Sequence, residues 1–421
     1  MSACVTPYGN QTQDPAVGDD NTDLGALVEE LESGAVAPRP PGDDTDVAPP
    51  LSGPTNRSRL RRYDVSGILE SMSLRDKIGQ RFAAYLRGRP TRTQIESLAS
   101  TAAPAGFILY PWNYGSPVDV RRLTTTATGA IEEATPGIRP LIMVDQEGGR
   151  VRALRFDSIV QLPSAFELGR LEDPEFMQSV AFVNGVHLLE LGVNMNLAPV
   201  LDLYGRPDST IIGDRSMGND PAIVSDLAEA YVDGARAAGL IVTAKHFPGH
   251  GVSQVDSHGS LPIVDLTLDD LRRRELVPFQ AAVDAGIDVV MTAHILFRSI
   301  DPNLPVTLSP VFIRNLLRDE MGFAGVVMTD GLEMGAISRN FGVQETLELT
   351  LKAGVDLVLL YSSYDYVEMV DMVEEMVSEG VLSEELIEEG AARVLELKAR
   401  YGLLDGVSGP LERPEPAGSS R

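Results

Sequence analysis

The chain has 421 residues, which is enough for one large domain or two ordinary ones. Its formal net charge is −26, from 61 acidic residues against 35 lysines and arginines. A surface this acidic repels phosphate backbones, so we expect no nucleic-acid partner. Hydrophobic residues make up 43% of the chain, and no run approaches the roughly 18 apolar residues of a membrane helix. We therefore expect a soluble globular protein.

The single cysteine, Cys4, excludes a disulfide within the chain and a cluster of thiolate metal ligands. It follows Met1-Ser2-Ala3, and small residues before a cysteine are typical of the end of a bacterial lipoprotein signal. The charged start and apolar stretch of such a signal are missing. For the sequence as written we predict the cytoplasm. The alternative is a lipoprotein tethered through Cys4 to the outer face of a bacterial membrane, and only this lipid would bring the protein to a membrane.

Composition divides the chain into three parts. Residues 1–58 are rich in Asp, Gly, Pro and Thr, and are predicted to form a disordered acidic tail or tether. Residues 59–405 are predicted to form one folded domain. Residues 406–421 are predicted to be a flexible C-terminal tail.

From Tyr63 onward, short apolar runs alternate with longer amphipathic stretches, which indicates βα units and a parallel sheet. The eight predicted strands are Gln80–Leu86, Gly106–Tyr110, Leu141–Asp145, Val193–Val200, Ile241–His246, Val289–His294, Val326–Thr329 and Val355–Leu360. The predicted helices include Val118–Ala134, Pro174–Leu191, Pro221–Ala238, Leu268–Ala285, Pro310–Met321, Val343–Ala353, Val367–Glu379 and Ser383–Tyr401. This rhythm predicts an α/β fold, a single-domain TIM-like (β/α)8 barrel. An open, doubly wound sheet is the alternative.

Five of the apolar strands end in a charged or imidazole residue. These endings are Asp145, Asp202, Lys245-His246, His294 and Asp330. In a closed barrel the carboxyl ends of all strands meet at one rim, where active sites lie. We therefore expect these side chains to converge on one pocket.

The segment Lys245–Gly251, Lys-His-Phe-Pro-Gly-His-Gly, follows a strand and is succeeded by Asp256-Ser257-His258. Histidines and acids so close together are consistent with a metal site. Proline and glycines interrupt the segment, however, so a helical pair of imidazole ligands is disfavoured and we expect no metal. In an extended chain Asp256 and His258 lie on the same side, where the carboxylate can hold and polarise the imidazole for proton transfer.

Asp330 lies in Val326-Val327-Met328-Thr329-Asp330-Gly331. A carboxylate at the end of a buried strand is costly unless it is paired or functional. It is consistent with a nucleophile that attacks the anomeric carbon of a sugar, with a metal ligand, or with a cap of the next helix. The residues alone leave these three alternatives open.

Taken together, these motifs resemble glycoside hydrolase family 3, and specifically its single-domain β-N-acetylglucosaminidases of the bacterial cell-wall-recycling type. The resemblance covers residues from about 65 to 405 and implies the family's barrel fold. The matching stretches, in the family's order, are Val144–Val151, Leu197–Asp202, Ile212–Ser216, Lys245–Gly251, Asp256–His258 and Met328–Asp330.

The resemblance implies roles by position. Asp330 matches the nucleophile that forms a glycosyl-enzyme intermediate, and His258 matches the general acid/base, with Asp256 as its partner. The residues that match contacts to the sugar hydroxyls are Asp145, Arg215, Lys245 and His246. A further arginine contact of the family falls at Arg152 or Arg155, because the spacing here is altered. Gly331 stands where the family often has a second acid.

The implied activity is the retaining hydrolysis of terminal, non-reducing β-linked N-acetylglucosamine, from peptidoglycan-derived muropeptides or chitin oligomers, without a cofactor. The Asp256–His258 pair disfavours a β-glucosidase, because those relatives mostly take their acid from a second domain. A neutral His258 does not repel an incoming anion, so a phosphorylase that uses phosphate as acceptor is one alternative. A catalytically dead barrel that binds peptidoglycan fragments is another.

A few other residues are also candidates for a role in the site or in the structure. His294 either contacts substrate or is a satisfied residue of the rim, and His187 is predicted to be structural. Trp112, near Tyr110 and Tyr114, either stacks on a sugar or anchors a loop.

Overall fold

The computed structural model describes residues 63–204, 211–253, 255–361 and 363–407. Cys4 and the predicted tail 1–58 lie outside the described residues, as does most of the predicted C-terminal tail. These parts of the domain prediction, and the lipidation of Cys4, therefore stay predictions.

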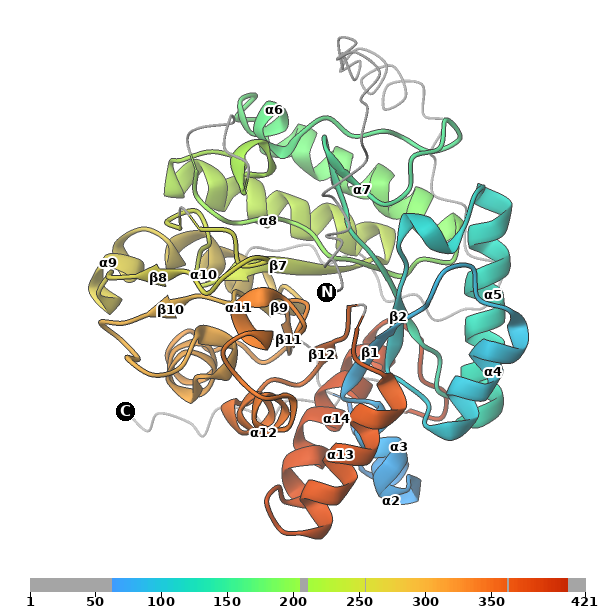
Figure 1. Ribbon diagram of the computed structural model, residues 1–421. Helices are drawn as coiled ribbons and strands as arrows, with labels where there is room; N and C mark the ends of the chain where they lie inside the picture. The colour runs from blue at the N-terminus through green and yellow to red at the C-terminus, as the bar shows by residue number, and fades with distance from the viewer. Residues whose placement is uncertain (1–62, 205–210, 254, 362, 408–421) are drawn as a thin grey trace, which may run out of the picture.

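All eight predicted strands are present, and they form one parallel sheet in the order β11-β9-β7-β6-β3-β2-β1-β12 (Figure 1). They are β1 (Phe82–Tyr85), β2 (Gly106–Ile108), β3 (Leu141–Val144), β6 (Met195–Asn196), β7 (Ile241–Phe247), β9 (Val289–Thr292), β11 (Val326–Thr329) and β12 (Val358–Leu359). A parallel bridge between Met328 and Leu357 joins the first strand of this order to the chain entering the last. The sheet is thus a nearly closed barrel, which confirms the predicted (β/α)8 fold over the open sheet.

The helices lie outside the strands (Figure 1). They are α2 (Ser66–Ser71), α3 (Leu74–Gly79), α4 (Arg92–Thr101), α5 (Pro117–Ala134), α6 (Ala165–Gly169), α7 (Pro174–Glu190), α8 (Pro221–Ala238), α9 (Leu268–Arg273), α10 (Leu276–Ala285), α11 (Gly335–Ser338), α12 (Val343–Ala353), α13 (Tyr366–Ser378) and α14 (Glu384–Arg400). Their starts are encoded locally. Ser116 and Asp220 accept backbone hydrogen bonds at the first turns of α5 and α8, and a proline follows each of them.

Two predicted helices differ from the structure. The stretch predicted as one helix, Leu268–Ala285, is divided into α9 and α10 at Arg274, whose φ and ψ are −141° and −70°. A continuous helix would bring the ring of Pro278 against the carbonyl of Arg274, four residues earlier, so the proline forces this break. The helix predicted at Pro310–Met321 spans Val311–Glu320 and is wound as a π-helix.

Short paired segments lie beyond the strand ends. The antiparallel pair β4 (Gln146–Gly148) and β5 (Val151–Arg152) follows β3, and the parallel pair β8 (Ile263–Val264) and β10 (Leu296–Phe297) follows β7 and β9. They shape the rim of the barrel.

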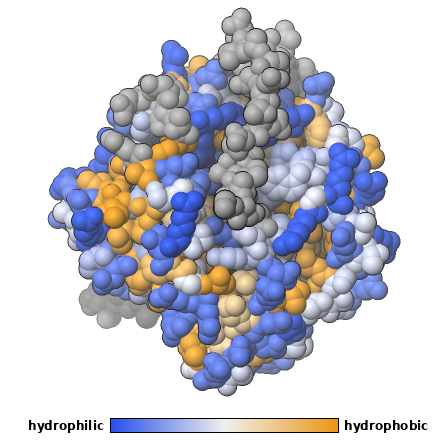
Figure 2. All heavy atoms as spheres, viewed as in Figure 1, coloured by the Kyte–Doolittle hydropathy of each residue, from blue (hydrophilic) through white to orange (hydrophobic). Residues whose placement is uncertain are grey.

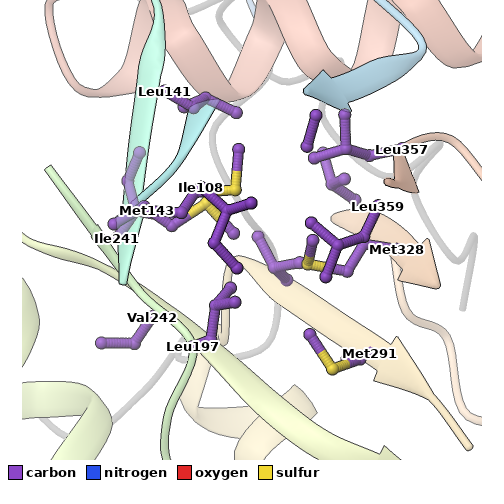
Figure 3. Close-up of a cluster of buried hydrophobic side chains, with 14 of the residues drawn as sticks. Ile108, Leu141, Met143, Leu197, Ile241, Val242, Met291, Met328, Leu357 and Leu359 are labelled. Carbon is purple, nitrogen blue, oxygen red and sulfur yellow. The ribbon is translucent and has the colours of Figure 1, made fainter. Parts of the chain in front are cut away.

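Apolar side chains fill the interior of the barrel (Figure 3). Ile108, Met143, Leu197, Met291 and Met328 come from five different strands or strand ends, and each is at most 2% exposed. This packing gives the rim pocket an apolar floor. On the outside, Figure 2 shows hydrophilic side chains interspersed with hydrophobic ones. Among the described helices, none combines the length and apolar character needed to cross a bilayer.

The packing of α14 against the start of the barrel contains a buried lysine. Lys398 is fully buried, and its Nζ donates a 2.7 Å hydrogen bond to Oε1 of Gln80. Burial lowers the pKa of Lys398 from 10.5 to about 7. The charged form is therefore disfavoured in the folded protein, and Lys398 reduces stability wherever it must carry its proton.

We predict that Lys398→Met raises the free energy of unfolding by a few kcal/mol below pH 7, on the order expected when a buried charge is replaced by an apolar chain. Folded Lys398 loses its proton near pH 7, whereas unfolded Lys398 keeps its proton up to about pH 10.5. The destabilisation by Lys398 therefore shrinks as the pH rises between these values, and the gain from Lys398→Met shrinks with it. Thermal unfolding of both proteins at pH 6.5 and 9.5 measures the difference. Lys352→Met, which removes a half-exposed partner of Glu348, is the control and should show little pH dependence. A gain from Lys398→Met that is equal at both pH values would contradict the prediction.

Candidate active site

A cavity of about 120 Å³ lies at the carboxyl ends of the strands. Its apolar floor includes Ile108, Leu197, Met291 and Leu359. Its polar lining consists of Tyr110, Asp145, Glu147, Arg215, Lys245, His246, His258, Asp330 and Tyr361. Six of the seven predicted site residues thus line one pocket, and the seventh, Asp256, is hydrogen-bonded to His258.

Two cations and two carboxylates form a network on one wall. Lys245 Nζ lies 2.7 Å from Asp145 Oδ1 and 2.6 Å from Glu147 Oε1. Arg215 binds Glu147 through two parallel hydrogen bonds of 2.8 Å each. Burial raises the pKa of Glu147, but Arg215 and Lys245 outweigh it and bring the pKa down to about 2. Glu147 is therefore ionised at neutral pH and fixes both cations in place.

Glu147 was not among the predicted site residues, although it lies in a stretch that carries the family resemblance. Its side chain is only 3% exposed, while that of Asp145 is 20% exposed. In an extended chain, residues two apart point to the same side, so Asp145 and Glu147 share one wall. That spacing was the signal that could have identified Glu147 from the sequence.

Asp202 lies behind the pocket and positions His246. Its Oδ2 is 2.7 Å from Nδ1 of His246, and its Oδ1 accepts the backbone N–H groups of His246 at 3.1 Å and His250 at 2.6 Å. Nδ1 of His246 is thereby engaged, and the ring's other nitrogen remains for the pocket that His246 lines. Asp202, predicted as a rim residue, thus acts through His246.

Asp330 follows β11, and its Oδ1 accepts the N–H of Gly331 at 2.7 Å. Burial raises the pKa of Asp330, but His246, His294 and His258 together hold it well below its usual 3.8. The carboxylate is therefore ionised throughout the pH range in which most proteins are folded. This charge state is the one that a nucleophile requires.

His294 is a satisfied residue of the rim. Its Nδ1 is 2.7 Å from Thr307 Oγ1 and its Nε2 is 3.0 Å from the carbonyl oxygen of Gly331, so both ring nitrogens have protein partners. Burial lowers the pKa of His294. His187 accepts a hydrogen bond from the backbone N–H of Val160, in agreement with its predicted structural role.

Asp256 and His258 form a pair at the mouth of the pocket. Asp256 Oδ1 is 2.8 Å from Nδ1 of His258 and also accepts the backbone N–H of His258 at 2.9 Å. The bond between the Asp256 carboxylate and the His258 ring is the main cause that raises the pKa of His258, and the charge of Asp330 contributes. The same bond lowers the pKa of Asp256 to about 2. His258 therefore carries a proton more readily than a free imidazole does.

Aromatic rings form the wall next to Asp330. Trp112 stacks on Tyr110 with ring centroids 4.5 Å apart, and Tyr110 meets Tyr361 edge-on at 5.4 Å. Tyr110 and Tyr361 line the cavity, while Trp112 is 37% exposed outside it. Tyr114 donates to the carbonyl of Ala153 and is a loop anchor.

Neither Arg152 nor Arg155 is in the lining of the cavity. Arg155 donates to the carbonyl oxygens of Arg152 and Arg150. The family's further arginine contact, at Arg152 or Arg155, therefore stays a prediction. Among the described residues, no group of three or more His, Cys, Asp or Glu side chains is arranged to hold a metal ion.

The sequence model of the family described as "Glycosyl hydrolase family 3 N terminal domain" matches residues 73–397. The chain belongs to glycosyl hydrolase family 3. This confirms the resemblance that its motifs indicated.

Two curated relatives illustrate the similarity. The chain is 36% identical over 267 residues to a "Beta-hexosaminidase" of Nitrosomonas eutropha, covering 62% of this chain and 74% of the relative. It is 34% identical over 360 residues to "Beta-hexosaminidase LpqI" of Mycobacterium tuberculosis, covering 83% and 88%.

Two solved structures have the same fold. A glycoside hydrolase family 3 β-N-acetylglucosaminidase from a Paenibacillus species matches with a TM-score of 0.75 and 36% identity, over 81% of this chain and 65% of the other. A β-N-acetylhexosaminidase from Beutenbergia cavernae matches with a TM-score of 0.72 and 29% identity, over 78% of this chain and 99% of the other.

We predict that Glu147→Gln lowers the free energy of unfolding by about 3–5 kcal/mol, because it leaves the buried Lys245 and the partly buried Arg215 without their shared counter-charge. The pKa of Glu147 falls from 4.5 in the unfolded chain to about 2 in the fold, so its contribution is complete above pH 4.5 and is lost as the pH falls toward 2. Denaturant unfolding at pH 7 and pH 3 should therefore show a smaller difference from the unmodified protein at pH 3. The control is Glu96→Gln, which breaks the exposed pair with Arg92 and should cost less than about 1 kcal/mol.

Proposed function

We propose that this protein is a retaining β-N-acetylglucosaminidase that removes terminal, non-reducing β-linked N-acetylglucosamine. One observation carries the proposal: an ionised carboxylate, Asp330, and an imidazole with a raised pKa, His258, line the same cavity. A nucleophile and a proton donor in one pocket are the two groups that retaining glycosidases need. The names of the relatives, β-hexosaminidases and β-N-acetylglucosaminidases, support N-acetylglucosamine as the sugar.

The floor of the pocket supports action at a chain end. Apolar side chains close the barrel beneath the rim, so a sugar can enter from the mouth but cannot thread through. Asp145, Lys245 and Arg215 lie on one wall, where they offer hydrogen-bond acceptors and donors to hydroxyl groups. We propose that they hold the non-reducing sugar, together with His246.

In the first step, a carboxylate oxygen of Asp330 forms a bond to the anomeric carbon while the bond to the leaving oxygen breaks. Oδ1 is engaged with the N–H of Gly331, which leaves Oδ2 free to attack. His258 gives its proton to the leaving oxygen, and Asp256 stabilises the imidazolium beforehand. The products are a glycosyl-Asp330 intermediate and an alcohol.

In the second step, neutral His258 takes a proton from water, and the resulting hydroxide oxygen forms a bond to the anomeric carbon as Asp330 leaves. Two inversions give net retention. Muropeptides derived from peptidoglycan and chitin oligomers both present the required sugar at a non-reducing end. We propose them as the substrate class.

The first test is the release of 4-nitrophenol from its β-N-acetylglucosaminide by the purified protein in phosphate-free buffer. We expect turnover, and Asp330→Asn should reduce kcat roughly 10³-fold or more, because it removes the nucleophile while keeping its shape. The exposed Asp319→Asn is the control and should match the unmodified protein. Formation of N-acetylglucosamine 1-phosphate on addition of phosphate would show that the protein is a phosphorylase and not a hydrolase. Binding of the sugar without turnover, with or without phosphate, would contradict the proposed activity and indicate a binding protein.

The second test is the pH dependence of kcat/KM. His258 must be protonated in the first step, so we expect activity to fall on the alkaline side with an apparent pKa above the usual 6.5. Asp256→Asn removes the negative charge of the acceptor that raises this pKa, and should shift the alkaline limb to lower pH and reduce kcat/KM about 10- to 100-fold at pH 7. Because the pKa of Asp330 lies well below 3.8, its titration should add no acid limb above pH 4. An alkaline limb that is unchanged in Asp256→Asn would contradict the assignment of His258.

A further inference from the structure

The proton donor of this site lies on an exposed segment. Within residues 255–260, the side chains of Asp256 and His258 are 57% and 43% exposed, and Val255 is 42% exposed. The bond between Asp256 and His258 lies within this segment. It orients the imidazole relative to the segment, but it cannot fix the segment relative to Asp330. Something outside the segment must set the distance between the donor and the nucleophile.

Two backbone hydrogen bonds connect this segment to the chain that follows the nucleophile. The N–H of Gly335 donates to the carbonyl oxygen of His258 at 3.0 Å, and the N–H of Ala336 donates to that of Ser257 at 3.0 Å. Gly335 and Ala336 begin α11, the first helix after β11 in the chain (Figure 1). The nucleophile and the contacts of the proton donor therefore belong to one stretch of chain, residues 330–336.

That stretch is hydrogen-bonded within itself and to the chain at β12. The carboxylate of Asp330 accepts the N–H of Gly331. The backbone N–H of Met334 donates to the carbonyl oxygen of Gly331 at 3.0 Å, and that of Leu332 donates to the carbonyl oxygen of Leu359 at 3.1 Å. Met334 and Ala336 are also buried. Because this stretch is packed and bonded, it can transmit the position of β11 to the exposed segment.

Gly335 is in contact with the carbonyl groups of the exposed segment. A Cβ atom at this position would lie 2.6 Å from the carbonyl oxygen of His258 and 2.8 Å from that of Gly259. Both are backbone atoms, so any side chain here must push the segment away. The helical backbone of Gly335 does not itself require glycine, and alanine is the better helix former. The close approach of His258 is thus the feature that requires a glycine.

A second contact holds the other side of the segment. Ser257 is buried, and its Oγ lies 3.1 Å from Nε2 of His250, whose backbone N–H is bound by Asp202. Ser257 is thus the buried residue between two exposed ones, Asp256 and His258, and it ties their turn to the protein.

We propose that Gly335 is a positioning residue for the proton donor, and that the start of α11 sets the place of His258 relative to Asp330. This inference rests on the proposed function, because it assigns Gly335 a role in the glycosidase reaction. Gly335 does not touch the sugar; it acts through the backbone of His258.

The test compares two substrates that differ in their need for a proton. The alcohol leaving group of a β-linked N-acetylglucosamine disaccharide needs protonation, whereas the leaving group of the 2,4-dinitrophenyl glycoside does not. In Gly335→Ala we expect kcat/KM for the disaccharide to fall on the order of 10- to 100-fold, since a donor displaced by about 1 Å loses that much. For the dinitrophenyl glycoside, kcat/KM should stay within about twofold, because this constant reports only the first step.

Two variants serve as references. Gly129→Ala, in α5 with open space around its Cβ, is the matched control and should leave both substrates unaffected. Ser257→Ala deletes one hydroxyl group and should show the same selective loss as Gly335→Ala, to a smaller extent. It keeps the inference testable if Gly335→Ala fails to fold.

The effect of Gly335→Ala should also vanish in a His258→Ala background, because two changes that act through one group are not additive. Equal losses on both substrates, no loss on either, or an undiminished effect without His258 would overturn the inference. Failure of the unmodified protein to cleave either substrate would instead overturn the proposed function.

Discussion

The pairing of eight short strands in one direction is the constraint on which the rest of this molecule depends. Because the strands are parallel and the sheet nearly closes on itself, their carboxyl ends lie on a single rim. Residues as far apart in sequence as Asp145 and Asp330 are brought to one cavity by this arrangement alone. The apolar interior beneath them closes the barrel, so the cavity has a floor and one mouth.

The cost of burying charge explains how the pocket is organised. An unpaired carboxylate in a low-dielectric site would take up a proton or destabilise the fold. Here two buried carboxylates have partners from other parts of the chain: Glu147 has Arg215 and Lys245, and Asp202 has His246. The same interactions that make burial tolerable also hold the polar atoms in fixed positions before a substrate arrives. Preorganised charges of this kind require no rearrangement during a reaction.

The two proposed catalytic groups are held in different ways. Asp330 follows a buried strand directly and shares its rigidity, whereas His258 belongs to an exposed segment. The exposed position gives the donor access to the leaving group and to water, but it removes the packing that would otherwise place it. The contacts with α11 and with His250 compensate for that lack of packing. Nucleophile and donor are thus coupled through seven consecutive residues, 330–336, although they are separated by many residues in the sequence.

The sequence by itself determined the eight strands, the polar residues at their ends and the family, because apolar periodicity, strand punctuation and the Lys245–Gly251 and Asp256–His258 motifs are local signals. The break at Arg274 was also encoded locally, by Pro278 four residues later, but the apolar pattern alone did not predict it. The partnership of Glu147 with Arg215, the role of Asp202 behind His246 and the contact of Gly335 with His258 were decided only by the tertiary structure. Each of these interactions joins residues whose spacing in the chain carries no information about their distance in space, and barrel closure is what brings them within reach.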